Sequence, residues 1–372
     1  MKREVFYIAG YDPKSYRFYY DLFRKNLENY SKNFNFQTKI SKINKTKNFP
    51  FFELDYKDIK TKYHFLTWND IVKKNWSNSV KDALIDAFMV FKIYIITGLF
   101  MKFKEGSIYQ LITGFYPFFY VLFSLIFSVI FGIFIFFFAT NYINFYFALI
   151  LGILSTFVLH NFLFKFGKKL AVFWIARICV FCAKWQENKG FLEKRIRLFV
   201  SEISKTLKTN ENNENFELIL VSHSVGSIML IEILYSLLSL NLSLNLLKKV
   251  KILTLGECIP LISYQKKAFE FRKKLEVISR FDFKWYDYTS IIDGACFPMI
   301  DFFRTSGVEA KFSPVFLSAK FHTLYEKNEY KKIKKDKNKA HFLYLYSPSI
   351  KGEFDFFYFI FGDKFLEEKV KL

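Results

Sequence analysis

The central part of the chain has no charged residues. From Gly106 through Phe164 there is no Lys, Arg, Asp or Glu, and apolar and aromatic residues dominate. About 20 apolar residues in a helix cross the hydrocarbon core of a bilayer, so this stretch is long enough to cross it twice. It predicts membrane helices at about Phe115–Ala139 and Phe145–Phe164, with the polar residues 140–144 as the turn between them.

A single very long buried helix would also explain the missing charge. Asn141 and Asn144 argue against it, because they interrupt the apolar run where a turn is needed. Basic residues flank the hairpin, whereas its tip is uncharged. Because positive residues tend to stay on the cytoplasmic side, both ends of the hairpin are expected in the cytoplasm. The flanking residues are Lys102 and Lys104 before the hairpin and Lys165, Lys168 and Lys169 after it.

The uncharged stretch divides the chain into three parts. We expect residues 106–164 to form the transmembrane hairpin, and residues 1–105 and 165–372 to form two parts of one soluble domain. The first residues of the chain lack an apolar run long enough for a signal peptide. The sequence therefore predicts a multi-pass protein of the inner, cytoplasmic membrane whose soluble domain faces the cytoplasm.

Cysteine is scarce in this chain of 372 residues. The four cysteines, at positions 179, 182, 258 and 296, are too few to suggest a disulfide framework in a chain of this length. Cys179 and Cys182 have the spacing of half a metal site, but no second Cys/His pair matches it. They fall in the mostly apolar helical run Leu170–Ala183, where one turn puts both thiols on one buried face. No metal or organic cofactor is expected.

The charge balance is strongly basic, with a formal net charge of +21. No helix-turn-helix, zinc-finger or RNA-binding signature accompanies it, so nucleic acid is not expected as a partner. An anionic membrane surface explains the charge equally well. The Lys-rich run from Lys331 to Lys339 is accordingly interpreted as a solvated or membrane-surface face.

Strand-like and helical segments alternate outside the hairpin. This alternation predicts an α/β domain with a mainly parallel sheet flanked by helices and interrupted by the hairpin. Helices are expected at Ser15–Tyr30, from Val80, at Lys194–Leu207 and at Ile228–Leu240. Strands are expected at Val5–Ala9, Thr38–Ile43, Tyr63–Thr67, Phe216–Val221, Val250–Leu255, Phe283–Thr289, Val315–Phe321 and His341–Tyr346.

The stretch "LILVSHSVGSIML", residues 218–230, carries the strongest chemical signal. A buried strand, a turn of small residues and an apolar helix follow one another, which is the context of the G-x-S-x-G nucleophile elbow. Ser224 stands at the position of the nucleophile, and Ser222 stands where the pattern has Gly. The backbone N–H of Val225 is a candidate donor to an oxyanion. A second candidate donor is the N–H of Tyr11, in the loop that follows the first strand.

In these features the chain resembles the α/β-hydrolase superfamily. It looks like small membrane-anchored bacterial hydrolases with a Gly-Tyr-Asp-Pro loop near the start and a transmembrane pair before the elbow. Locally it is also similar to class 3 (fungal-type) lipases, although the hairpin lies outside their pattern. Three segments carry that similarity, namely Ser222-His223-Ser224-Val225-Gly226, Thr289-Ser290-Ile291-Ile292-Asp293 and Ala340-His341-Phe342-Leu343-Tyr344.

The resemblance implies a Ser-His-Asp triad in the order Ser224, Asp293, His341. Asp287 and Asp301 remain rival acids. His322 is the alternative base, because a base directly after a late strand is the usual superfamily arrangement. We expect a membrane-anchored serine esterase or lipase that acts on an acyl ester, with a lipid-like substrate suggested by the anchor. The alternative is an inactive hydrolase fold that serves as a membrane-tethered binding or scaffold module.

Overall fold

A computed structural model describes residues 1–46, 49–77, 79–104, 108–187 and 189–370. Its centre is an eight-stranded sheet in the order β2-β3-β4-β1-β5-β6-β7-β8, in which β4, β1, β5, β6, β7 and β8 run parallel. Among the strands of the described residues, the pairs β2–β3 and β3–β4 are antiparallel. The strands are β1 (Lys2–Ile8), β2 (Lys39–Ile40), β3 (Phe51–Tyr56), β4 (Ile59–Phe65), β5 (Phe216–His223), β6 (Val250–Leu255), β7 (Lys284–Thr289) and β8 (Val315–Ser318).

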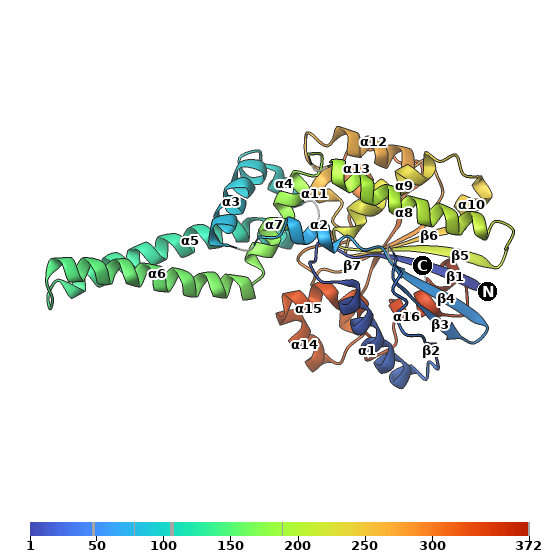
Figure 1. Ribbon diagram of the computed structural model, residues 1–372, viewed down its shortest axis with the longest axis horizontal. Helices are drawn as coiled ribbons and strands as arrows, with labels where there is room; N and C mark the ends of the chain where they lie inside the picture. Colours follow the sequence, from blue (N-terminus) through green and yellow to red (C-terminus); the bar gives the residue numbers. More distant parts are fainter. Residues whose placement is uncertain (47–48, 78, 105–107, 188, 371–372) are drawn as a thin grey trace.

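Helices cover both faces of the sheet, so the prediction of an α/β domain with a mostly parallel sheet is confirmed (Figure 1). One face carries α8 (Lys189–Thr209), α9 (Gly226–Leu238), α11 (Pro260–Ser263) and α12 (Phe269–Ile278). The other face carries α1 (Tyr16–Phe34), α14 (Lys327–Lys335), α15 (Lys337–Phe342), α16 (Phe356–Phe361) and α17 (Leu366–Lys369). The remaining helices are α2 (Asn69–Lys74), α3 (Val80–Val90), η1 (Phe91–Ile95), α4 (Leu99–Phe103), α5 (Ile108–Ala139), α6 (Phe145–Lys169), α7 (Val172–Ala183), α10 (Leu244–Lys248), α13 (Phe302–Thr305), η2 (Phe321–Thr323) and η3 (Leu343–Leu345).

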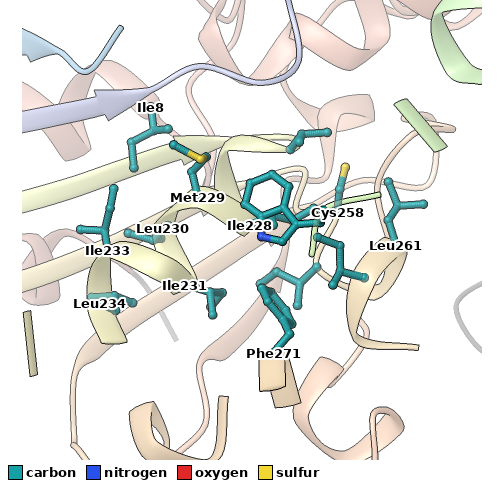
Figure 2. Close-up of a cluster of buried hydrophobic side chains, with 14 of the residues drawn as sticks. Ile8, Ile228, Met229, Leu230, Ile231, Ile233, Leu234, Cys258, Leu261 and Phe271 are labelled. Carbon is teal, nitrogen blue, oxygen red and sulfur yellow. The ribbon is translucent and has the colours of Figure 1, made fainter. Parts of the chain in front are cut away.

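Two hydrophobic cores lie on the two faces because side chains alternate along each strand. In β1, Phe6 and Ile8 face the first core, whereas Val5 and Tyr7 face the second. Figure 2 shows Ile8 and Phe271 of α12 gathered with the apolar side chains of α9. The helix that follows the predicted elbow is thus a core helix, which fixes the place of its first residues.

The hairpin of α5 and α6 projects from the sheet domain (Figure 1). Both helices are long and apolar enough to cross a membrane, and only 17% and 11% of their most apolar windows are buried. A core helix of a soluble protein would be mostly buried. The predicted helices are confirmed, although α5 begins seven residues earlier than expected (Ile108 rather than Phe115) and α6 ends five residues later (Lys169 rather than Phe164).

The expected strand at His341–Tyr346 is wrong. This segment forms the end of α15 and the short helix η3, and its apolar side chains pack on a face of the sheet. The carboxylate of Asp336 accepts a hydrogen bond from the N–H of Lys339 at 2.9 Å and caps α15. This cap favours a helical turn over the extended form that the aromatic residues suggest.

Candidate functional site

Ser224 lies in a sharp turn between β5 and α9. Its backbone φ is +56°, in the left-handed region that residues other than glycine seldom adopt. The N–H of Ser224 donates to the carbonyl of Leu255 at 2.9 Å, and its own carbonyl accepts the N–H and the hydroxyl of Ser227. These bonds hold a backbone strain of the kind found at catalytic sites.

Two glycines allow the turn to sit against the loop that follows β1. A Cβ on Gly226 would lie 2.5 Å from the carbonyl oxygen of Ile8, so any side chain there would collide with backbone. A Cβ on Gly10 would lie 2.9 Å from the Cβ of Ser224. In the sheet, β1 has β4 on one side and β5 on the other, so the strand order changes direction between β1 and β5. Ser224 follows the end of β5 at this switch point, which is where parallel sheets of this kind bind ligands.

Ser222, the departure from the elbow pattern, is fully buried at the end of β5. Its hydroxyl has no hydrogen-bond partner within the described ranges. The residue pairs with Ile8 and Thr254 in the neighbouring strands. The sheet therefore accommodates Ser222, and the turn at Ser224 forms without a glycine at this position.

His341 and Asp293 form a buried hydrogen-bonded pair. The Nδ1 of His341 lies 2.8 Å from Oδ1 of Asp293, and side-chain exposures are 3% and 0%. The same oxygen accepts the N–H of Ala295 at 3.0 Å, which fixes the carboxylate. A proton on Nδ1 that faces the carboxylate leaves Nε2 as the basic nitrogen of the ring.

Ser224 does not hydrogen-bond His341 in the part of the chain that the structure covers. Its hydroxyl lies 3.5 Å from the sulfur of Cys258 instead. Burial raises the pKa of Cys258 well above its ordinary value. Cys258 is therefore a neutral thiol at neutral pH, and the thiolate, which is the reactive form of cysteine, is disfavoured there.

The rival residues have other places in the fold. Asp301 caps α13 by accepting the N–H groups of Phe303 and Arg304, and Asp287 accepts a hydrogen bond from the hydroxyl of Thr254 inside the sheet. His322 is exposed in η2, where its ring lies against Tyr330. The structure thus brings Asp293 together with His341 and not with His322.

His223 is a residue whose position the sequence did not reveal. Its Nε2 donates to the backbone carbonyl of His341 at 2.9 Å, and the two rings lie 4.7 Å apart. Burial, followed by the charge of His341, lowers the pKa of His223 to about 3, although the hydrogen bond opposes this shift. His223 is therefore neutral and holds the backbone of His341.

The two backbone donors predicted for an oxyanion lie beside Ser224. Val225 directly precedes α9, and Tyr11 follows Gly10, which contacts Ser224. Across the described segments, neither N–H group makes a hydrogen bond. The Tyr11 side chain is buried against Trp76 and Phe181, and its hydroxyl donates to the carbonyl of Asn75 at 2.8 Å. This packing anchors the loop while its N–H stays available.

Two cavities meet at the site. A small apolar one of about 40 Å³ is lined by Ser224 and Cys258, and it has room for only a few water molecules. A large one of about 1000 Å³ is lined by His341 and Asp293 and by residues from the base of the hairpin. The two cavities share the lining residues Thr113, Ile175, Gly294 and Ala295.

The first turns of α5 cover the loop that carries Asp293. The side-chain amide of Gln110 donates to the carbonyl oxygens of Asp293 and Cys296, and Gln110 is buried. Gly114 lets α5 lie against Phe100, because a Cβ there would come within 2.8 Å of that ring. The apolar hairpin and the candidate site are therefore directly connected.

Among the described residues, no three or more His, Cys, Asp or Glu side chains lie close enough together to hold a metal ion. The four cysteines are buried and free. Comparisons of the chain with protein-family models, with curated proteins and with solved structures gave no match. The geometry of this site is accordingly the basis for a functional assignment.

Proposed function

We propose that the protein is a membrane-anchored serine hydrolase of the α/β-hydrolase type that cleaves an acyl ester. The observation that carries this proposal is the buried His341–Asp293 pair, whose cavity shares lining residues with the cavity of Ser224, a serine in a left-handed turn. The two cavities that contain these groups share a wall, which supports a single reaction centre. The order of the three residues along the chain is that of the superfamily.

In this mechanism the hydroxyl of Ser224 attacks the ester carbonyl while Nε2 of His341 takes its proton. Asp293 holds the imidazole and stabilises the imidazolium that forms. The N–H groups of Val225 and Tyr11 donate to the negative oxygen of the tetrahedral intermediate. Ser224 must first turn from Cys258 towards His341, a movement that substrate binding would drive when it widens the small cavity.

The second candidate function is a non-catalytic, membrane-tethered binding module. The observation that favours it is the contact of Ser224 with Cys258 in place of His341. Hydrogen bonds of catalytic groups are often long in ligand-free enzymes and tighten with substrate, so we prefer the hydrolase.

Labelling with a fluorophosphonate probe separates the two functions, because only an activated serine reacts. We expect the wild-type protein to be labelled and Ser224→Ala to lose labelling, with ester hydrolysis lowered by on the order of 10³-fold or more. His341→Ala should lose nearly as much activity, because triad members act as a unit. His322→Ala is the matched control and should keep most of it.

Retained labelling of the Ser224→Ala variant would exclude this serine as the nucleophile. A larger loss in His322→Ala than in His341→Ala would make His322 the base. An unlabelled but correctly folded wild-type protein would favour the binding module. Folding of each variant is checked by its thermal unfolding in detergent.

We further propose that the hairpin spans the inner membrane and that the sheet domain lies in the cytoplasm. The uncharged tip and the basic flanks support this orientation. A reporter that is active only in the cytoplasm should be active when fused after Leu372. It should be inactive when inserted at Asn141, in the tip. The opposite pattern would reverse the orientation.

A further inference from the structure

We propose that the large cavity binds the anionic, phosphate-bearing head group of a membrane lipid and presents its acyl ester to Ser224. This inference names the substrate class of the proposed hydrolase and rests on that function. The cavity lies between the base of the hairpin and the segment α14–α15, and its volume of about 1000 Å³ suits a whole head group and glycerol.

The charge of the cavity wall is the first argument. Within the described residues, four of its lysines make no ion pair, and the fifth, Lys320, pairs with Glu353. Its two acids are already engaged, because Asp293 contacts His341 and Asp336 caps α15. The wall therefore attracts an anion, and lysine ammonium groups are suited to bind phosphate. The four lysines are Lys169, Lys334, Lys335 and Lys337.

The position of the cavity is the second argument. Part of its wall is formed by Tyr109, Ile112 and Tyr116 of α5 and by Leu170 and Trp174 at and after the end of the hairpin. Aromatic side chains of this kind gather at membrane–water interfaces. A ligand in this cavity would thus touch apolar, interfacial side chains at the base of the hairpin as well as the lysines of α14 and α15 and Lys169 at the end of α6, which suits the apolar and anionic parts of a lipid.

The connection to the reaction centre is the third argument. His341 and Asp293 line the basic cavity, and Ser224 lines the apolar cavity behind the shared residues Thr113, Ile175 and Gly294. With the head group among the lysines, the ester would lie near His341. The acyl chain would extend towards the apolar wall around Ser224, which includes Phe103, Ile178, Leu261 and Phe297.

Ser224, His341 and one water molecule are enough for the complete hydrolysis of an ester bond in such a lipid. A bond forms between Ser224 Oγ and the acyl carbon, and the ester bond to the glycerol oxygen breaks. The glycerol oxygen leaves with the proton that His341 took from Ser224. Water then attacks the acyl-serine with His341 as base, which releases the fatty acid and restores the serine.

Hydrolysis by the full-length protein in neutral-detergent micelles tests the substrate class. Phosphatidylglycerol, phosphatidylcholine and diacylglycerol with the same acyl chains are compared, together with acyl coenzyme A as a soluble, phosphate-bearing thioester. We expect phosphatidylglycerol to have the highest kcat/KM. Equal rates for the anionic lipid and the two lipids without net charge would overturn the proposal, and a preference for acyl coenzyme A would overturn the choice of a lipid.

Two triple variants separate the cavity from general basic charge. Lys334→Gln, Lys335→Gln and Lys337→Gln together should lower kcat/KM for phosphatidylglycerol by about tenfold or more. In the same variant, hydrolysis of a small neutral nitrophenyl ester, which has no phosphate, should fall far less than hydrolysis of phosphatidylglycerol. The control changes Lys327, Lys331 and Lys332 to Gln, which removes the same charge from exposed positions outside the cavity wall. Equal losses in both triple variants would refute a cavity-specific role.

A binding measurement distinguishes failure of this inference from failure of the proposed function. The Ser224→Ala protein should bind more radiolabelled phosphatidylglycerol than phosphatidylcholine. Adding the three cavity lysine substitutions to the Ser224→Ala protein should abolish this preference. If phosphatidylglycerol is bound preferentially but the wild-type protein hydrolyses no ester, the lipid site stands and the proposed hydrolase function is rejected. Hydrolysis of the neutral ester without a preference for the anionic lipid would reject the lipid site alone.

Discussion

His223 links the turn at Ser224 to His341, the proposed base. Its ring nitrogen donates to the carbonyl of His341, so it fixes the backbone from which the imidazole projects. Since its pKa is lowered to about 3 by burial, it does not change charge in the range where a hydrolase works. A titration of activity near neutral pH would therefore report other groups.

Replacing His223 tests this positioning role. We expect His223→Leu to lower kcat/KM for a neutral ester by between about 10- and 100-fold, because a small displacement of the base is costly. His223→Gln keeps an N–H donor and should retain most of the activity, with an unchanged pH profile. The measurement is the pH dependence of kcat/KM, with thermal unfolding as control. Equal losses in both variants would show that the hydrogen bond is not what matters.

The residues of the site differ in how far the sequence reveals them. Ser224 is predictable because strand, turn and helix are neighbours in the chain. The histidine that pairs with Asp293 is harder to predict, because both His322 and His341 follow Asp293 in the chain. Only the packing of α15 decides between the two histidines. Gln110 and Cys258 carry no local signal, because their role depends on contacts across more than 100 and 30 residues.

The two hairpin helices approach closely at a pair of glycines. A Cβ on Gly152 would lie 2.8 Å from the carbonyl oxygen of Gly132, and a Cβ on Gly132 would collide with Thr156. Ser128, Ala139 and Ala148 are also buried along α5 and α6. Small residues at a helix crossing allow the backbone contact that holds membrane helices together.

Gly152→Leu should therefore push α5 and α6 apart. We expect a loss of about 1–3 kcal/mol in the stability of the hairpin, as for other overpacked contacts. The measurement is disulfide crosslinking between Ser128→Cys in α5 and Thr156→Cys in α6, which should become less efficient when the helices separate. Leu151→Ala, at an exposed position, is the control. Unchanged crosslinking in Gly152→Leu would contradict the predicted separation.

The elements themselves were predictable where local pattern and burial agree. The hairpin follows from the missing charge, and β6 was predicted at the bounds observed. The antiparallel strand β3 was missed, because its mixed sequence gives a weak pattern and its pairing with β4 stabilises it. The expectation of a strand at His341–Tyr346 was wrong because aromatic residues pack equally well in a buried helical turn.

At the scale of the whole molecule, two buried acids make stability depend on pH. Burial raises the pKa of Asp287 to about 7, although the hydroxyl of Thr254 opposes this shift. Burial, followed by the charge of Asp287, raises the pKa of Glu257 well above its ordinary value. Between the unfolded pKa of about 4 and the folded value, the folded state binds more protons than the unfolded state. The contribution of Asp287 to stability therefore falls as pH rises from about 4 to about 7.

Asp287→Asn isolates this contribution, because Asn keeps the shape and has no charge. We expect the variant to gain stability relative to wild type as pH rises to 8, by on the order of a few kcal/mol. Below pH 6.5, His223 makes stability rise with pH, because its pKa is lower in the folded state than in the unfolded state. The quantity to compare is therefore the difference in stability between the variant and the wild-type protein, in which this effect cancels. Chemical unfolding in detergent at pH 5 and pH 8 measures it. A difference that does not change with pH would contradict the assignment.

The pairing of β1 with both β4 and β5 has a consequence for biogenesis. About 150 residues, including the hairpin, separate β4 from β5. At a synthesis rate of about 5–20 residues per second, β5 leaves the ribosome on the order of 10 s after β4. During that interval the nascent N-terminal strands lack the neighbour that covers one edge of β1. If the hairpin spans the membrane as proposed, its insertion precedes completion of the sheet, and the open edge of β1 needs protection until translation supplies β5.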